Sequence, residues 1–292
     1  MKEPIFKDPE IQRKFDEDGF VKIPLLSEEE VDALARMREE YFPEKGSVFF
    51  SSSYLDDYDL KMEISNKISE AITAGLEKQC VNFRLIGAAY LIKGIGKHSE
   101  MPMHQDWTIV DEQEFYAVNV WIPLTDTNEE NGTLELMKGS HNWNEALRAP
   151  TLPMSFAGLE SKIKPKLTVV PAKKGEVIIL NQATIHYSKP NMTDEIRPAV
   201  TSGMISQKAP LKFHYWDKER NQIEEFAQKD DFLLRFENFM EAIYKRPLMG
   251  ESKQFFDYTI PRWNEKDLDR LTNTRVNKPS FFQRIFGQSC TE

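Results

Sequence analysis

The sequence predicts a mainly β fold with flanking helices. From about residue 81 it contains short runs rich in β-branched and aromatic residues, each bounded by Gly, Pro or Asn. Before and after this stretch, apolar residues recur with the period of a helix. Short strands at such spacing are typical of an antiparallel sandwich or barrel, so we expect one β core with helices around it. The runs are FRLIGAAYLI, EFYAVNVWIPL, TLELM, LTVV, EVIILN and RPAVTSGMI.

Residues 1–80 are expected to form a helical front. Ser27 followed by Glu30 matches a capping box, which marks the start of a helix. Just before it, the alternating segment DGFVKIPLL predicts a strand that leads into this helix. A second helix is predicted over about 60–79, because four apolar residues repeat there at every fourth position. They are Ile64, Ile68, Ile72 and Leu76.

We expect a single domain over residues 1–292, with its β core at 81–206. Residues 142–166 interrupt the core as a proline-containing, aperiodic insertion, the kind of loop that often carries function. After about 207 the helical period returns, so 207–292 is predicted to be a helical C-terminal extension that packs on the core. The residues at helical spacing are Phe226, Leu233, Phe236, Met240 and Ile243. The terminal segment PSFFQRIFG is expected to pack as well.

Composition excludes several classes of protein. Hydrophobic residues make up 40% of the 292 residues, too many for a wholly disordered chain. A net charge of −9 repels phosphate backbones, so we expect no nucleic-acid partner. Cys80 and Cys290 are too few for a disulfide framework. There is neither an apolar leader segment nor an apolar run long enough for a membrane span, and we expect a cytoplasmic protein.

Any imidazole-based site must draw on five histidines, His98, His104, His141, His186 and His214. In MPMHQDWTIV, His104 and Asp106 would share one face of a strand, because alternate residues do. Taken alone, such a pair is more common as a hydrogen-bonded surface pair. His186 follows the strand EVIILN and supplies a second imidazole. Two histidines and one carboxylate are the ligand set that leaves three positions open on non-haem Fe(II).

Arg197 lies eleven residues after His186, on the next predicted strand. Its planar fork suits bidentate binding of a carboxylate, which lysine would not reproduce. A lone buried arginine is more often a structural ion-pair partner. Beside a metal triad, a role in binding a carboxylate cosubstrate becomes the better interpretation.

These motifs in this order resemble the phytanoyl-CoA dioxygenase family of Fe(II)/2-oxoglutarate-dependent oxygenases. The likeness covers most of residues 15–205, and the pair Arg197-Pro198 belongs to it. The matching segments are DGFVKIPLLSEEEVDAL, HQD at 104–106, NVWIPLTDTNEENGTLELMKGSH and GEVIILNQATIHYSKPN. One departure is Lys138, where relatives commonly carry Pro before Gly-Ser-His.

The resemblance implies a double-stranded β-helix, a jelly-roll core similar to that of the cupins. It places Fe(II) on His104, Asp106 and His186, and 2-oxoglutarate on Arg197 with help from Ser188 and Trp121, with O₂ as the third participant. The expected reaction is hydroxylation of an unactivated C–H bond of a small or medium organic molecule, with release of succinate and CO₂. Oligomeric state is not predicted. Candidate substrate contacts are Met103, Trp107, Asn119 and Arg148, together with Met101 and the loop Phe49–Tyr54.

Three alternatives stay open at this point. The same oxidising chemistry could end in desaturation or oxidative cyclisation of the substrate. The chain could instead be a non-catalytic jelly-roll protein that binds a metal or ligand. It could also be a cupin-like metalloenzyme without a cosubstrate, which Arg197 and Ser188 argue against.

Overall fold

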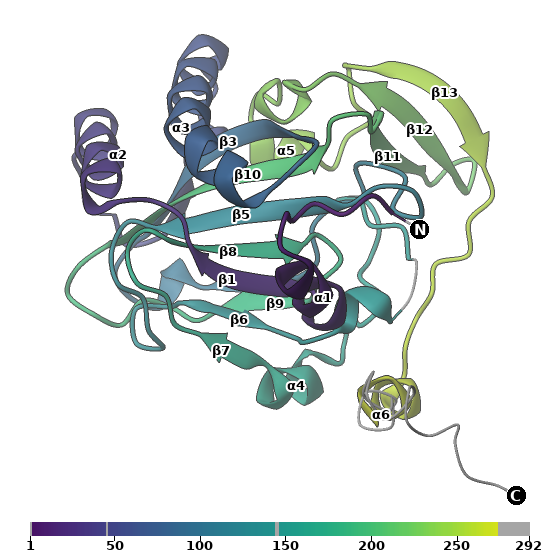
Figure 1. Ribbon diagram of the computed structural model, residues 1–292. Coiled ribbons are helices and arrows are strands. Elements are labelled where there is room, and N and C mark those ends of the chain that lie inside the picture. The colour runs from purple at the N-terminus through teal and green to yellow at the C-terminus, as the bar shows by residue number, and fades with distance from the viewer. Residues whose placement is uncertain (1, 45, 144–145, 274–292) are drawn as a thin grey trace, which may run out of the picture.

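The computed structural model describes residues 2–44, 46–143 and 146–273, and its centre consists of two antiparallel sheets (Figure 1). The larger sheet has six strands in the order β1-β8-β5-β10-β3-β2. The smaller has four, in the order β4-β9-β6-β7. The chain returns to each sheet from distant parts of the sequence, as in a jelly roll. The predicted fold class, mainly β with flanking helices around a jelly-roll core, is confirmed.

The strands of these two sheets follow the predicted runs closely. The larger sheet contains β1 (Phe20–Pro24), β2 (Phe49–Ser51), β3 (Phe83–Lys93), β5 (Ala117–Pro123), β8 (Glu176–Asn181) and β10 (Arg197–Ser206). The smaller contains β4 (Met101–His104), β6 (Leu134–Leu136), β7 (Thr168–Val170) and β9 (His186–Ser188).

Alternation along the central strands divides the core into two layers. On β5, Val120 and Ile122 pack in one hydrophobic cluster with the helices, whereas Trp121 faces the other way and packs in a second cluster with Leu134 and Leu136 of β6. Successive strand residues point to opposite faces, which explains the division. The outer layer therefore binds helices, and the inner layer lies between the sheets.

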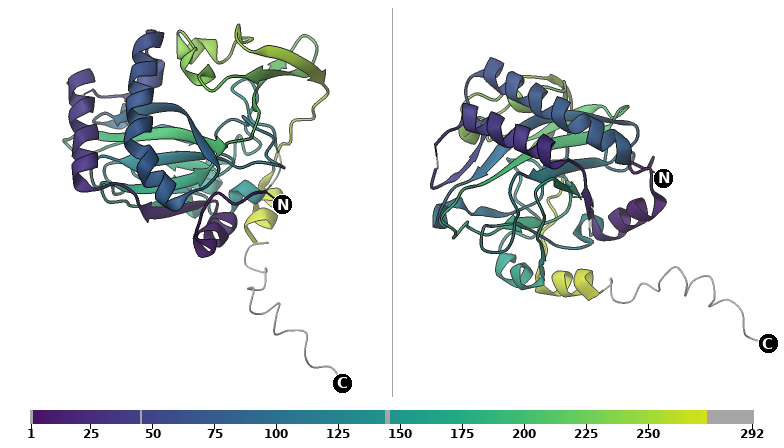
Figure 2. Two further views of the ribbon diagram at one scale, coloured as in Figure 1. Left: turned by 45° about the horizontal axis from the view of Figure 1, so that its top comes forward. Right: turned by 60° about the vertical axis from the view of Figure 1, so that its left-hand side comes forward.

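Two helices cover the outer face of the larger sheet, α2 (Glu28–Tyr41) and α3 (Tyr58–Gln79) (Figure 2). The predicted capping box is present, with Ser27 and Glu30 bonding each other's backbone N–H. The four residues at every fourth position of α3 are all fully buried. Both predicted helices are confirmed, and a further one, α1 (Pro9–Asp18), precedes β1.

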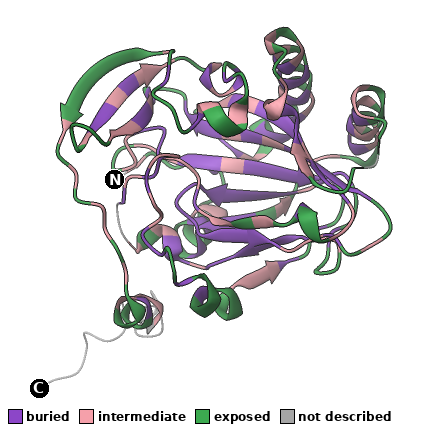
Figure 3. Cartoon of the chain, turned by 180° about the vertical axis from the view of Figure 1, so that it is seen from behind, coloured by how far each residue is buried: buried purple, intermediate pink, exposed green. Residues whose placement is uncertain are grey.

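The predicted helical extension is wrong over most of its described length. Residues after 207 form a third antiparallel sheet of β11 (Leu211–Asp217), β12 (Gln222–Gln228) and β13 (Glu251–Phe256). It is followed by α6 (Glu265–Asn273), and the short helix α5 (Phe239–Ala242) lies between β12 and β13. Figure 3 shows this sheet beside the core, with β13 largely exposed.

In this third sheet, polar residues occupy buried positions, so its sequence lacks the apolar–polar alternation that predicts a strand. Phe213 of β11 lies opposite Phe226 of β12, and both are buried. His214 and Glu224 are buried too, so apolar and polar residues do not alternate as they do in an ordinary strand. Helical spacing from Phe226 to Ile243 is therefore a coincidence across a strand, a turn and a short helix. PSFFQRIFG and Cys290 lie outside the described residues.

Candidate metal centre and cavity

His104, Asp106 and His186 come together at one end of the smaller sheet. His104 ends β4 and His186 begins β9, and the two are direct partners in this antiparallel pair. Their ring centroids are 4.1 Å apart. Asp106 Oδ1 lies 3.7 Å from His104 Nε2 and 3.9 Å from His186 Nε2. With ligand atoms all within 4.8 Å of one another, these three side chains form a group able to hold one metal ion.

Backbone carbonyls orient both imidazoles. The Nδ1–H of His104 donates to the Pro102 carbonyl at 2.7 Å, and that of His186 donates to the Thr184 carbonyl at 2.9 Å. Because a carbonyl can only accept, each Nδ1 carries the proton and each Nε2 presents a lone pair to the cluster. Burial and the neighbouring His186 lower the pKa of His104 to about 4. At neutral pH His104 is therefore in the form that binds a metal.

Asp106 is fixed from three directions. Its backbone N–H donates to the Gln182 carbonyl at 2.9 Å, and its own carbonyl accepts from Arg148 Nε at 2.7 Å. Asn119 Nδ2 donates to its carboxylate Oδ2 at 3.4 Å. The other oxygen, Oδ1, faces the two imidazoles, so the carboxylate can offer one oxygen to a metal while the second stays hydrogen-bonded.

Arg197 is a buried cation with unused donors. It begins β10, is 2% exposed, and its guanidinium lies 5.1 Å from the centroid of the Trp121 ring. Nε and Nη1 are buried and have no hydrogen-bond partner among the described residues. Burial lowers the pKa of Arg197 to about 9. An unpaired buried charge is costly, so this arrangement favours an anionic ligand.

One cavity of about 320 Å³ joins the metal cluster and Arg197. Ser188, Trp121, Trp107 and Asn119 line it, and so does Met101. Residues of the predicted front loop line it as well, namely Phe49, Ser51, Ser53 and Tyr54. The structure thus brings most of the sequence-predicted site residues to one space.

Two predicted substrate contacts lie elsewhere, and these predictions are corrected. Met103 packs in a hydrophobic cluster that includes Phe156 and Ile163, because it faces away from its strand neighbour His104. Arg148 is 3% exposed, and Nε, Nη1 and Nη2 are all bonded within the protein. Its partners are the carbonyls of Asp106 and Ala146 and the Glu112 carboxylate, so its charge is already compensated.

Two acidic residues just before α3, Asp56 and Asp57, also have structural partners. Asp57 caps α3 by accepting from the Leu60 N–H at 3.0 Å. Asp56 accepts from the Asn238 N–H at 2.6 Å. These hydrogen bonds give Asp56 and Asp57 structural roles in the fold.

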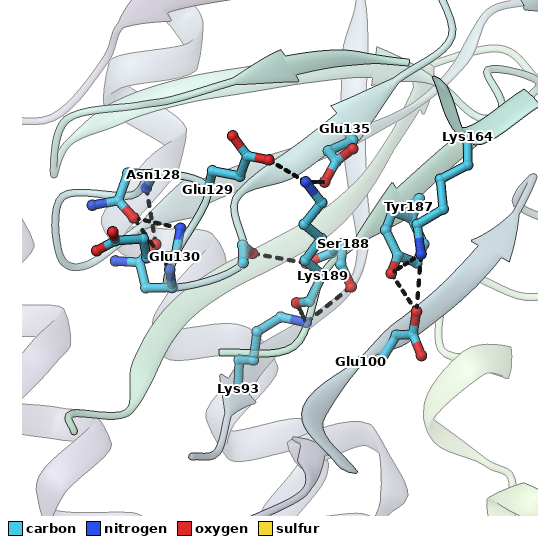
Figure 4. A network of polar contacts seen from close by, with 12 residues as sticks. Lys93, Glu100, Asn128, Glu129, Glu130, Glu135, Lys164, Tyr187, Ser188 and Lys189 are labelled. Atoms are coloured by element: carbon cyan, nitrogen blue, oxygen red, sulfur yellow. Dashed lines mark hydrogen bonds and ion pairs between the residues drawn. The ribbon is translucent and has the colours of Figure 1, made fainter. Parts of the chain in front are cut away.

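Sequence reasoning missed a buried lysine beside Arg197. Lys93 is fully buried at the end of β3, opposite Arg197. Its ammonium donates to the carbonyls of Ser99 (2.7 Å), Ser188 (3.3 Å) and Lys189 (2.7 Å), as Figure 4 shows for the last two. Burial lowers the pKa of Lys93 to about 7. In the sequence, Lys93 is only a lysine at the end of an apolar run, and that signal is too weak to predict that its ammonium is buried and bonded to three carbonyls.

A second polar group holds the strand that carries His186. The Tyr187 hydroxyl donates to the Glu100 carboxylate and accepts from Lys164 Nζ at 2.7 Å (Figure 4). Lys164 belongs to the insertion 142–166, and its ammonium also lies 4.2 Å from the centre of the Tyr187 ring. Through these contacts, Lys164 of the insertion is joined to Tyr187 of β9 and to Glu100, which directly precedes β4.

Comparison with known proteins agrees with this geometry. The family model described as phytanoyl-CoA dioxygenase matches residues 15–199. Phytanoyl-CoA dioxygenase domain-containing protein 1 of Danio rerio is 28% identical over 68% of this chain and 89% of that protein. Its homolog of Dictyostelium discoideum is 31% identical over 42% of this chain and 47% of that protein.

Solved structures show the same fold at lower identity. The non-heme alpha ketoglutarate dependent carbocyclase SnoK is 22% identical, with a TM-score of 0.50 over 70% of this chain and 86% of that chain. The epimerase SnoN, solved with Fe3+, alpha ketoglutarate and nogalamycin RO, is 19% identical, with a TM-score of 0.51 over 70% and 87%. Across the described residues, no helix has both the length and the apolar character needed to cross a bilayer.

Proposed function

Because this chain belongs to the phytanoyl-CoA dioxygenase family and is an Fe(II)/2-oxoglutarate-dependent oxygenase, we propose that it hydroxylates an unactivated C–H bond. The substrate is a small or medium organic molecule, and succinate and CO₂ are the other products. The cluster of His104, Asp106 and His186 next to the unpaired Arg197 is the observation that supports this most strongly.

His104, Asp106 and His186 are the proposed iron ligands. The fit rests on donor chemistry, because the Nε2 atoms of two imidazoles and one carboxylate oxygen converge on one point. This donor set suits Fe(II) and leaves coordination positions open. The carbonyls that hold each Nδ1, and Asn119 on Asp106, keep the three donors aimed at that point before any metal arrives.

Arg197 is the proposed anchor for the far carboxylate of 2-oxoglutarate. The guanidinium, whose Nε and Nη1 have no partner in the described structure, would bind that carboxylate, which would offset the cost of burying the guanidinium alone. Trp121 supports the guanidinium from its ring face. Ser188 lies in the same cavity and donates to the Gly132 carbonyl at 2.7 Å, and we propose that this hydroxyl turns to the cosubstrate when it binds.

When bound, Fe(II) with 2-oxoglutarate and O₂ supplies the oxidising power for breaking the C–H bond. The side chains of the protein do the remaining work. Arg197 and Ser188 orient the cosubstrate, the carbonyls of Pro102 and Thr184 hold the two imidazoles in place, and the apolar cavity keeps bulk water from the reacting carbon. The cytoplasmic location and the lack of a nucleic-acid partner belong to the same proposal.

Substrate-dependent succinate release tests this function. Purified protein is incubated with Fe(II), 2-oxoglutarate, O₂ and a metabolite library, and the product mass is measured. We expect succinate together with a product that has gained one oxygen atom. Loss of two hydrogen atoms would instead identify desaturation or ring closure, activity without 2-oxoglutarate would identify a cosubstrate-independent enzyme, and no succinate with any substrate would identify a binding protein.

A histidine pair provides the matched control. His104→Ala should abolish succinate release, because it removes a proposed ligand. His98 is exposed and outside the metal-binding group, so His98→Ala should leave the rate unchanged. Equal rates for both variants would contradict the proposed ligand set.

A further inference from the structure

Resting on the proposed oxygenase function, we propose that the substrate is small, uncharged and largely apolar, and carries one hydrogen-bonding group that Gln182 recognises. The aromatic wall formed by Tyr54, Trp107 and Phe239 would hold its apolar part. Both features line the same cavity as the metal cluster.

The aromatic wall is made of rings in direct contact. Trp107 stacks on Phe239 with ring centroids 6.1 Å apart and planes 12° apart. Phe239 also lies 5.1 Å from the Tyr54 ring. Behind the wall, Phe213 and Phe236 meet Trp107 edge-on. Trp107 directly follows Asp106, so this apolar surface begins next to the metal cluster.

Residues beyond the family match contribute the far side of this cavity. The match ends at residue 199, whereas Leu233 and Phe239 come from the C-terminal extension. Two hydrogen bonds to the front of the chain fix their position. Asn238 N–H donates to Asp56 at 2.6 Å, and the buried ammonium of Lys61 donates to the Phe236 carbonyl at 2.8 Å. The extension therefore shapes the substrate end together with the part of the chain that matches the family.

Charge in the cavity is confined to its cosubstrate end. Among the described lining residues, the metal cluster and Arg197 carry the groups that are charged or bind metal near neutral pH. Arg197 is assigned to 2-oxoglutarate, and no lysine or second arginine lines the cavity within the described residues. A carboxylate or phosphate on the substrate would be buried here without a counter-ion, which is costly.

Gln182 supplies the single polar contact that we assign to the substrate. It is 6% exposed and lines the cavity, and its side-chain oxygen is buried without a hydrogen-bond partner in the described structure. Its backbone is held by Ala117 on one side and Asp106 on the other. A buried acceptor without a partner costs free energy, which an O–H or N–H of a bound molecule would recover.

Cavity size limits the substrate further. A volume of about 320 Å³ is at the lower end of ligand pockets, which span about 300–1,000 Å³. The cosubstrate would occupy part of it. A molecule of about the size of a single aromatic ring with a short polar substituent fits what is left.

Three probes of matched shape test the proposal: phenylacetamide, phenylacetate and ethylbenzene. Each is titrated by calorimetry into full-length protein loaded with Zn(II) and 2-oxoglutarate, since Zn(II) prevents turnover. We expect phenylacetamide to bind about tenfold tighter than ethylbenzene. A neutral hydrogen bond contributes at most about 1.5 kcal/mol, which corresponds to this factor. Phenylacetate should bind weakest.

Paired variants identify the responsible residues. Gln182→Leu keeps the side-chain size and should remove the preference for phenylacetamide over ethylbenzene, whereas Gln207→Leu, at an exposed site, should keep it. Phe239→Ala should weaken both uncharged probes about tenfold by removing an aromatic contact. Met240→Ala changes the exposed neighbour on the same helix and should weaken neither.

Several outcomes would overturn the inference. They are phenylacetate binding as well as phenylacetamide, an undiminished preference in Gln182→Leu, and no binding of either uncharged probe up to its solubility limit. A separate titration of 2-oxoglutarate alone into the Zn(II)-loaded protein tests the underlying oxygenase function. If that function is wrong, 2-oxoglutarate will not bind. Binding of 2-oxoglutarate with reversed probe selectivity would contradict the substrate class alone.

Discussion

Replacing Arg197 by methionine should raise stability and abolish cosubstrate binding at the same time. In the ligand-free protein the guanidinium is buried with two donors unpaired, so folding buries a charge without compensation. Methionine fills similar space without that charge. A structural ion-pair arginine would behave in the opposite way, because its removal would lower stability.

The magnitudes follow from the contacts. Burial lowers the pKa of Arg197 from 12.5 to about 9, which corresponds to about 5 kcal/mol as an upper limit for the cost of the buried charge. Relaxation and water entry reduce such costs, so we expect Arg197→Met to raise the free energy of unfolding by about 1–3 kcal/mol. Losing two charge-assisted hydrogen bonds of about 1.5–3 kcal/mol each should weaken 2-oxoglutarate binding at least about 100-fold.

Two measurements on the same samples check this prediction. Urea unfolding of the metal-free protein gives the stability change, and calorimetry with the Zn(II)-loaded protein gives the Kd of 2-oxoglutarate. Arg197→Lys keeps the charge but loses the fork, so it should weaken binding about 10- to 100-fold. Arg38 is buried on α2 with only its Nε unpaired among the described residues, and its Nη1 and Nη2 donate to the Phe42 carbonyl and the Glu39 carboxylate, so Arg38→Met should lower stability and leave the Kd unchanged. A less stable Arg197→Met with wild-type affinity would refute the reasoning.

Three further changes have defined outcomes. Asp106→Ala should weaken Fe(II) binding at least about 100-fold in a competitive chelator titration, and unchanged metal affinity would remove it from the ligand set. Hydrogen bonds from His214 and Lys212 hold the pKa of Glu225 at about 2, so its stabilising effect is complete above pH 4.5 and is lost as the pH falls toward 2. Glu225→Gln should therefore cost about 1.5–3 kcal/mol at pH 7 and flatten the acid dependence of unfolding between pH 4.5 and 2; an equally steep dependence would contradict the assignment. Tyr90→Phe removes a buried hydroxyl that donates to the Leu34 carbonyl at 2.9 Å, and thermal unfolding should show a loss of about 1 kcal/mol unless that bond contributes nothing.

Local patterns were sufficient for the helical front and the β core. The capping box at Ser27 and the fourfold spacing from Ile64 are short-range features, and a short-range rule predicts them correctly. The prediction of a helical C-terminal extension was wrong because its structure does not depend on short-range features alone. Its strands bury His214 and Glu224 against the Thr108 carbonyl and Arg246, which lie outside these strands, and a pattern rule cannot anticipate such partners.

The residues able to bind a metal and a carboxylate were named in advance, because imidazole, carboxylate and guanidinium groups have restricted chemistry whatever the fold. By itself, the sequence thus determined which groups can take part. Only the tertiary structure decided which of them remain free to act. Arg148 and Arg197 are both buried arginines, yet distant backbone carbonyls and a carboxylate occupy the donors of the first, and two donors of the second have no partner. That difference depends on contacts between residues far apart in the chain, as does the presence of Phe239 in the cavity lining, and such contacts form only when the chain is folded.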